Sequence, residues 1–135
     1  MRKLLTGFSF LLVLFFSSCI DAKDTKAEVK LVSAEEMQSI LELEDVQLVD
    51  VRSAEEFAIE HIPNAQNIDF RSPTFEADIT KLDKSKPVVL YCKSGGRSSK
   101  CVKKMKEAGF EKIYELDGGI SKWKHAKESQ QPEKS

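Results

Sequence analysis

The apolar run VVLY at residues 88–91 constrains the fold of this chain more than any other feature. A strand with one solvent-facing side alternates apolar and polar residues, whereas a strand covered on both sides is apolar throughout. Fully covered strands belong in the middle of parallel sheets, because the crossover connections place helices on both faces. The run therefore predicts a central strand in a parallel sheet.

Short apolar segments alternate with helix signals along the rest of the chain. Further strands are predicted at residues 29–32, 46–51, 66–69 and 113–116. Helices are predicted after the capping boxes Ser33–Glu36 and Ser53–Glu56, after Ser72 as N-cap with Pro73 following, from about 97 to Gly109, and over 120–127. This alternation predicts the α/β class: one domain at residues 29–128, with a mainly parallel five-stranded sheet flanked by helices on both faces.

The N-terminus has the organisation of an export signal. A positive start precedes a nearly continuous apolar run of 13 residues at 4–16, shorter than the roughly 20 residues that span a bilayer. The segment FSSC at 16–19 resembles the lipobox of bacterial lipoproteins, although Phe16 stands where that box more often has leucine. The resemblance implies a signal peptide at 1–18, a lipid on Cys19 and a periplasmic location at a bacterial membrane. A plain secretory signal cut near Ser18 is the alternative.

Polar segments and balanced charge limit the remaining possibilities. Residues 19–28 are expected to form a tether behind the lipidated cysteine, and residues 129–135 a disordered tail. The net charge is −1, from 21 Lys and Arg against 22 Asp and Glu. Nucleic-acid binders usually carry a basic excess, so this balance argues against such a partner. One small domain with balanced charge fits a monomer.

Two thiols remain if Cys19 carries lipid. Cys101 is expected to pack in the core near Met105, but an oxidising compartment favours disulfides, so a bridge from Cys92 to Cys101 stays open. The two cysteines and the two histidines, His61 and His125, lack the paired spacing of zinc sites. No metal or cofactor is expected.

Cys92 directly follows the predicted central strand, and α/β folds bind ligands at that end of their strands. The next five residues are Lys93, Ser94, Gly95, Gly96 and Arg97. A glycine-rich turn that enters a helix can direct backbone N–H groups inward and hold an anion. Free cysteines are often buried core residues, but a core cysteine needs no glycine pair and arginine behind it. We therefore expect amides from 93–97 to converge on an ionised, reachable sulfur.

Three segments resemble the rhodanese family of sulfurtransferases over residues 30–127. YCKSGGRS at 91–98 resembles the active-site loop, LVDVRSAEEFAIEHIPNAQNI at 48–68 a segment around Asp-Val-Arg and His-Ile, and ELDGGISKW at 115–123 the closing signature. Glu60 departs from the family, which usually has glycine before the histidine, and Gly96 occupies a variable loop position. The resemblance implies that Cys92 is the nucleophile and that residues 92–97 bind the substrate.

The implied reaction moves sulfane sulfur from thiosulfate or a similar anionic donor, through a Cys92 persulfide, to cyanide or a thiol. Arg97 is expected to bind the donor's oxyanion or, alternatively, to pair with a carboxylate; Lys93 is expected to add positive potential or to be merely solvated. Asp50 and Arg52 are expected to support the loop, with Glu56 as a partner of Arg52. His61 and Trp123 are interpreted as structural, and Gly118 and Gly119 as a tight turn near the site.

Two other functions stay open from the sequence. A sulfur carrier would accept persulfide sulfur from a partner protein with little turnover of thiosulfate. A phosphatase or arsenate reductase is less favoured, because four residues separate Cys92 from Arg97 where protein tyrosine phosphatases have five. The shorter loop suits a sulfur atom better than a tetrahedral phosphate.

Overall fold

The computed structural model describes residues 26–129, which form a parallel five-stranded sheet with helices on both faces. The strand order is β1-β5-β4-β2-β3. The strands are β1 (Glu28–Val32), β2 (Gln47–Asp50), β3 (Gln66–Asn67), β4 (Val88–Tyr91) and β5 (Lys112–Leu116). The predicted α/β class is confirmed, and the apolar run at 88–91 is the central strand.

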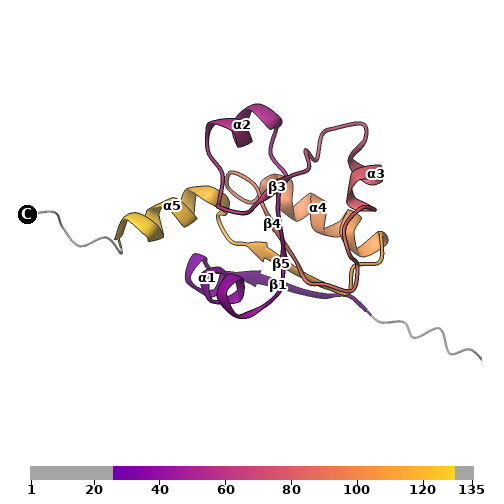
Figure 1. Cartoon of the computed structure of the whole chain (residues 1–135), viewed down its shortest axis with the longest axis horizontal. Coiled ribbons are helices and arrows are strands. Elements are labelled where there is room, and N and C mark those ends of the chain that lie inside the picture. The colour runs from indigo at the N-terminus through magenta and orange to yellow at the C-terminus, as the bar shows by residue number, and fades with distance from the viewer. Residues whose placement is uncertain (1–25, 130–135) are drawn as a thin grey trace, which may run out of the picture.

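Four helices connect the strands of this part of the chain, and a fifth follows the last strand. They are α1 (Ala34–Leu43), α2 (Ala54–Ile59), α3 (Phe75–Ile79), α4 (Gly96–Glu107) and α5 (Gly119–Ser129). Figure 1 shows α1 and α5 on one side of the sheet and α3 and α4 on the other. The two sides correspond to two separate clusters of buried apolar residues.

Strand β4 contributes side chains alternately to the two clusters. Val88, Leu90 and Cys92 belong to the cluster beneath α3 and α4, whereas Val89 and Tyr91 belong to the cluster beneath α1 and α5. All four residues of the strand are fully buried, as the absence of polar alternation predicts. The same alternation places Cys92 on the α4 face, directly before the loop that leads into α4.

Both predicted capping boxes are present and fix where their helices begin. The Ser33 hydroxyl accepts from the Glu36 N–H at 3.1 Å, and the Ser33 N–H donates to the Glu36 carboxylate at 2.9 Å. Ser53 and Glu56 make the same reciprocal pair at 3.2 and 3.0 Å. The second box places the N-cap Ser53 three residues after β2 ends at Asp50, so Glu56 follows the C-terminal end of that strand by six residues.

Some predicted boundaries are wrong. Helix α3 begins at Phe75 rather than after Ser72, because the Ser72 hydroxyl accepts from the Thr74 N–H at 3.2 Å within a turn. The predicted apolar face of that helix (Phe75, Ile79 and Leu82) is nevertheless buried as expected. Strand β1 begins at Glu28, whose N–H donates to the Glu111 carbonyl, one residue before the predicted strand. Helix α5 continues to Ser129.

The predicted signal peptide at 1–18, the lipid site Cys19, most of the tether and the tail from 130 lie outside the described residues. Between residues 26 and 129, no helix combines the length and the apolar character needed to cross a bilayer.

Candidate active site

The loop after β4 curls around the Cys92 sulfur. The Gly95 N–H donates to the Sγ atom at 3.0 Å, and Gly95 has a φ of +112°. This left-handed conformation is costly for residues with a Cβ, which explains a glycine three positions after the cysteine. Gly95 is also the N-cap of α4, so the turn that brings its amide to the sulfur also starts the helix.

Hydrogen-bond donors counteract the effect of burial on the thiol. Burial raises the pKa of Cys92, but the Ser98 hydroxyl and the N–H groups of Ser98, Gly95 and Ser94 together hold it below its ordinary value. Of the expected amides from 93–97, the Gly95 N–H donates to the sulfur, and the N–H groups of Ser94 and of Ser98, which lies outside that range, also lower the pKa of Cys92. Ser98 was not among the predicted site residues, although its place in the first turn of α4, directly after Arg97, is visible in the sequence.

The Cys92 side chain is more buried than the prediction of a reachable sulfur implied. Only 1% of the residue is exposed. It nevertheless lines a pocket of about 350 Å³ together with Arg71, Lys93, Ser94, Gly96, Arg97 and Lys100. Cys92 therefore lines a surface pocket, although almost none of its own surface is exposed.

Cationic residues dominate the lining of this pocket. Arg71, Lys93, Arg97 and Lys100 contribute to it, and no carboxylate does so within the described part of the chain. The side chains of Arg71, Lys93 and Lys100 make no ion pair with residues 26–129, so their charges are available to an anion. Arg71 and Lys100 were missed in the sequence. Lys100 follows Arg97 by almost one helical turn, a spacing that could have revealed it, whereas nothing local identifies Arg71.

Arg97 is held by a carboxylate, which is the alternative that the sequence left open. Its guanidinium donates to the two Glu56 oxygens at 2.6 and 2.8 Å. This bidentate geometry is the strong form of an ion pair. The hydrogen bond from Arg97 is the main reason that the pKa of Glu56 falls to about 2; burial opposes the shift, and Ser53 supports it. Arg97 thus ties the loop after β4 to α2.

We expect the Glu56–Arg97 pair to be measurable as acid-dependent stability. The pKa of Glu56 is about 2 in the folded protein against an ordinary 4.5. Its contribution is therefore fully present above pH 4.5 and is lost as the pH falls through about 2. Between pH 4.5 and about 2, the free energy of unfolding of wild type should fall by roughly 2 kcal/mol more than that of Glu56→Gln, after a discount for solvent screening. Urea unfolding at several pH values measures the difference.

Glu55→Gln is the matched control for that experiment, because Glu55 lies beside Glu56 on α2 and is exposed. It should keep the wild-type pH dependence. An unchanged pH dependence in Glu56→Gln as well would show that the ion pair contributes nothing to stability.

Asp50 and Arg52 form a buried ion pair behind the loop. The Arg52 Nη2 atom donates to Asp50 at 2.6 Å, and both side chains are almost fully buried. The expected pairing of Arg52 with Glu56 is wrong, because Glu56 binds Arg97 instead. Arg52 also donates to the Glu60 carbonyl at 2.7 Å. This contact uses only the backbone of Glu60, which explains how the chain accommodates glutamate where the family usually has glycine.

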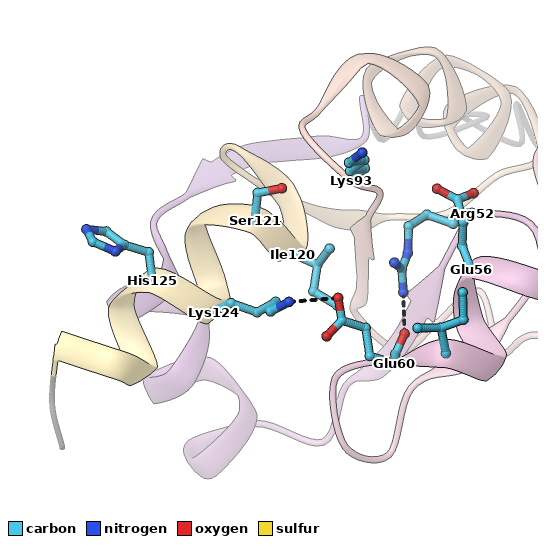
Figure 2. A pocket seen from close by; sticks show the side chains of 9 residues that line it. Arg52, Glu56, Glu60, Lys93, Ile120, Ser121, Lys124 and His125 are labelled. Atoms are coloured by element: carbon cyan, nitrogen blue, oxygen red, sulfur yellow. Dashed lines mark hydrogen bonds and ion pairs between the residues drawn. The ribbon is translucent and has the colours of Figure 1, made fainter.

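A second pocket, of about 460 Å³, lies beside the first and shares Lys93 with it. Figure 2 shows its walls, which come from α2 and the loop after it on one side and from α5 on the other. The Glu60 carboxylate accepts from Lys124 at 2.8 Å across this pocket. The ion pairs of Arg52, Glu56 and Glu60 therefore connect the elements around the loop.

The turn at Gly118 and Gly119 packs against the backbone of the loop, as predicted. The Ile120 N–H donates to the Cys92 carbonyl at 2.9 Å, and the Ser121 N–H to the Lys93 carbonyl at 3.2 Å. Gly119 has a φ of +62°, and a Cβ there would lie 2.6 Å from the Lys93 carbonyl carbon. The first turn of α5 thus donates to the carbonyls of Cys92 and Lys93 in the loop after β4.

The residues interpreted as structural behave accordingly. The His61 Nδ1 atom lies 2.9 Å from the Phe57 carbonyl, and its ring stacks on the Phe57 ring. Trp123 is buried where α5 packs on the sheet. Residues 26–129 contain no cluster of three or more His, Cys, Asp or Glu side chains that could hold a metal ion.

Cys101 is a free, fully buried thiol in the same cluster as Met105, as the core interpretation predicts. Burial raises the pKa of Cys101 to about 12. Iodoacetamide should therefore modify Cys92 in the native protein at least about 100-fold faster than Cys101. Peptide mass spectrometry measures both rates, and denaturation should equalise them. A peptide that links the two cysteines in unreduced protein would instead support a disulfide.

Comparison with known proteins places this geometry in a family. The Rhodanese-like domain family matches residues 33–126. The chain is 33% identical over 95 residues to thiosulfate sulfurtransferase GlpE of Coxiella burnetii, and the aligned region covers 70% of this chain and 87% of that protein. It is 32% identical over 115 residues to tRNA uridine(34) hydroxylase of Buchnera aphidicola, covering 82% of this chain but only 37% of that longer protein.

Solved structures agree with this assignment. A rhodanese-like domain protein from Staphylococcus aureus superposes with a TM-score of 0.63 at 32% identity, over 70% of this chain and 90% of that one. The rhodanese-like domain of the Anabaena Alr3790 protein superposes with a TM-score of 0.66 at 25% identity, over 78% and 86% of the two chains. The sequence match and the shared architecture together establish that this chain belongs to the rhodanese-like domain family.

Proposed function

We propose that the protein is a sulfurtransferase that carries sulfane sulfur on Cys92. The observation that supports this most directly is the setting of Cys92: the Gly95 N–H donates to its sulfur, neighbouring donors lower its pKa, and the residue lines a cationic pocket. Such a pocket suits an anionic sulfur donor such as thiosulfate, because it offsets the repulsion between that donor and a thiolate. The similarity to thiosulfate sulfurtransferase GlpE supports the same activity.

The reaction has two displacement steps. The Cys92 thiolate attacks the outer sulfur of thiosulfate; the sulfur–sulfur bond of the donor breaks, and sulfite leaves with the electron pair. An acceptor, either cyanide or a thiolate, then attacks the outer sulfur of the Cys92 persulfide. The bond to Cys92 breaks, and Cys92 leaves as a thiolate with the electron pair. A lowered pKa makes Cys92 a better leaving group in this second step.

Each group around the sulfur has a role in this proposal. The N–H groups of Ser94 and Gly95 stabilise the thiolate, and the cationic residues Lys93, Arg71 and Lys100 attract the donor. Gly96 keeps the pocket open, because a glycine presents no side chain there. Arg97 adds positive charge while it stays paired with Glu56. Asp50 and Arg52 hold the backbone behind the loop.

Intact mass and turnover test the proposal together. Thiosulfate should add one sulfur atom to the purified protein, a reductant should remove it, and cyanide should then yield thiocyanate catalytically. Sulfur uptake with negligible thiocyanate turnover would identify a carrier that serves a partner protein. Absence of sulfur uptake by correctly folded protein with thiosulfate and persulfide donors would refute the proposal. Phosphate release from an aryl phosphate would indicate the phosphatase alternative.

A further inference from the structure

The Ser98 hydroxyl faces three acceptors but has only one hydrogen. Its Oγ atom lies 3.5 Å from the Cys92 sulfur, 3.2 Å from the Gly95 carbonyl oxygen and 2.9 Å from Glu115 Oε1. Ser98 is fully buried, so water does not compete for these positions. The direction of this one hydrogen therefore determines whether Ser98 donates to the sulfur or accepts from it.

Glu115 reaches this hydroxyl from β5, across the face of the sheet that α4 covers. It is the register partner of Leu90, whose side chain packs beneath α3 and α4. Its Oε1 atom also lies 2.6 Å from the Ser99 hydroxyl. Ser99 in turn lies 2.8 Å from the Gly95 carbonyl oxygen. Two serine hydroxyls thus share two acceptors, and Ser98 alone also contacts the sulfur.

One arrangement suits the thiol. The Cys92 S–H donates to Ser98 Oγ, and Ser98 donates to Glu115, its nearest and charged acceptor. Ser99 donates to the same Glu115 oxygen at 2.6 Å, since a carboxylate oxygen with two lone pairs can accept from both hydroxyls. In this arrangement Ser98 presents a lone pair to the sulfur, which favours the protonated form.

A second arrangement suits the thiolate. Ser98 turns its hydrogen to the sulfur, and Ser99 keeps Glu115 supplied with a donor at 2.6 Å. The Gly95 carbonyl keeps the Ser99 backbone N–H as a donor at 3.1 Å. No buried polar atom loses its last partner, so the exchange needs only one hydroxyl rotation.

We propose that Glu115 is a positioning residue for Cys92, which acts through Ser98 by competing with the sulfur for the single hydroxyl hydrogen. The inference rests on the proposed function for its purpose. When an acceptor takes the outer sulfur and Cys92 departs with the electron pair, the Ser98 hydrogen turns to the new negative charge and Ser99 satisfies Glu115.

Other charged groups near the sulfur are the same in both arrangements. On α4, Cys101 and Lys104 lie within electrostatic reach of this cluster. Burial raises the pKa of Cys101 most; Lys104 lowers it, and Glu115 raises it. The pocket supplies cations, and α2 supplies Glu56, which is paired with Arg97 of α4. Strand β1 presents Leu31 as the register partner of Glu115, and β2 carries the Asp50–Arg52 pair. Substitutions at Glu115, Ser98 and Ser99 leave all of these in place.

The pH dependence of Cys92 alkylation in the full-length protein tests the competition. Glu115→Gln should lower the pH midpoint of Cys92 alkylation by about 0.5–1 pH unit, because a neutral amide holds the Ser98 hydrogen less tightly. Below that midpoint, the alkylation rate should rise roughly 3- to 10-fold. Ser99→Ala should raise the midpoint, since Glu115 then keeps the Ser98 hydrogen. Opposite shifts at two neighbouring contacts cannot come from general loosening of the fold, which thermal melting checks independently.

A double-mutant comparison separates hydrogen bonding from the charge alone. In a Ser98→Ala background, Glu115→Gln should shift the midpoint by less than half as much as in wild type. Glu111→Gln, which removes an exposed carboxylate just before β5, should not shift it. Equal shifts with and without Ser98, or no shift in Glu115→Gln, would overturn the proposal. Alkylation needs no sulfur donor, so this outcome is independent of whether thiosulfate is turned over.

Discussion

Cys92→Ser should reduce thiocyanate formation from thiosulfate and cyanide to the uncatalysed background, a loss of at least about 1,000-fold. Serine has nearly the same shape as cysteine and preserves the contacts with Gly95 and Ser98. Its hydroxyl, however, does not ionise near neutral pH, and it forms no persulfide. The variant should also gain no mass with thiosulfate. A coupled measurement of mass and turnover on the same sample checks both.

Cys101→Ala is the control for this variant, because Cys101 lies in the same apolar cluster without lining the pocket. It should keep sulfur uptake, although the lost packing lowers stability. Residual turnover in Cys92→Ser, lost only when Cys101 is also replaced, would mean that the buried thiol carries the sulfur. That result would contradict the assignment of Cys92 as the nucleophile.

Gly119→Ala should destabilise the protein by about 2–4 kcal/mol and impair sulfur transfer at the same time. The φ of +62° is unfavourable for alanine, and the added Cβ would overlap the Cys92 carbonyl oxygen and lie 2.6 Å from the Lys93 carbonyl carbon. These atoms belong to backbone that cannot move without disturbing the loop. Urea unfolding measures the loss of stability, and thiosulfate turnover at a temperature where the variant stays folded measures the damage to the site.

Gly96→Ala is the matched comparison for stability. A Cβ at Gly96 meets nothing within 4 Å, and Gly96 is the first residue of α4. Its unfolding free energy should stay within about 1 kcal/mol of wild type, because alanine favours helix formation. If both alanine variants were equally stable, the close approach of Gly119 to the loop would be of no energetic consequence.

The sequence places Cys92 at the end of the central strand because the signals for that position are local. An unbroken apolar strand predicts a central position, the residue after it lies at the ligand-binding edge, and the following glycines predict a turn. The capping boxes at Ser33 and Ser53 were equally reliable, since each involves residues only three apart. Contacts that close within a few residues are determined by the chain itself.

The missed features come from contacts between distant segments. Glu56 and Arg97 are 41 residues apart, and Glu115 lies 17 residues beyond Ser98. Arg71 joins the pocket from the connection after β3. The sequence left open whether Arg97 binds the anionic donor or pairs with a carboxylate of the protein. Only the packing of α2 against the loop shows that Arg97 pairs with Glu56. Partner choice among charged residues depends on tertiary geometry.

The first turn of α5 donates hydrogen bonds to the carbonyls of Cys92 and Lys93. Helix α5 therefore helps to hold the backbone of Cys92 in place. Shortening the protein from its carboxyl end, or fusing a bulky cargo so that it strains this helix, would release two backbone restraints on the sulfur-bearing segment. An affinity tag for purification therefore belongs behind a generous spacer, well beyond Ser129.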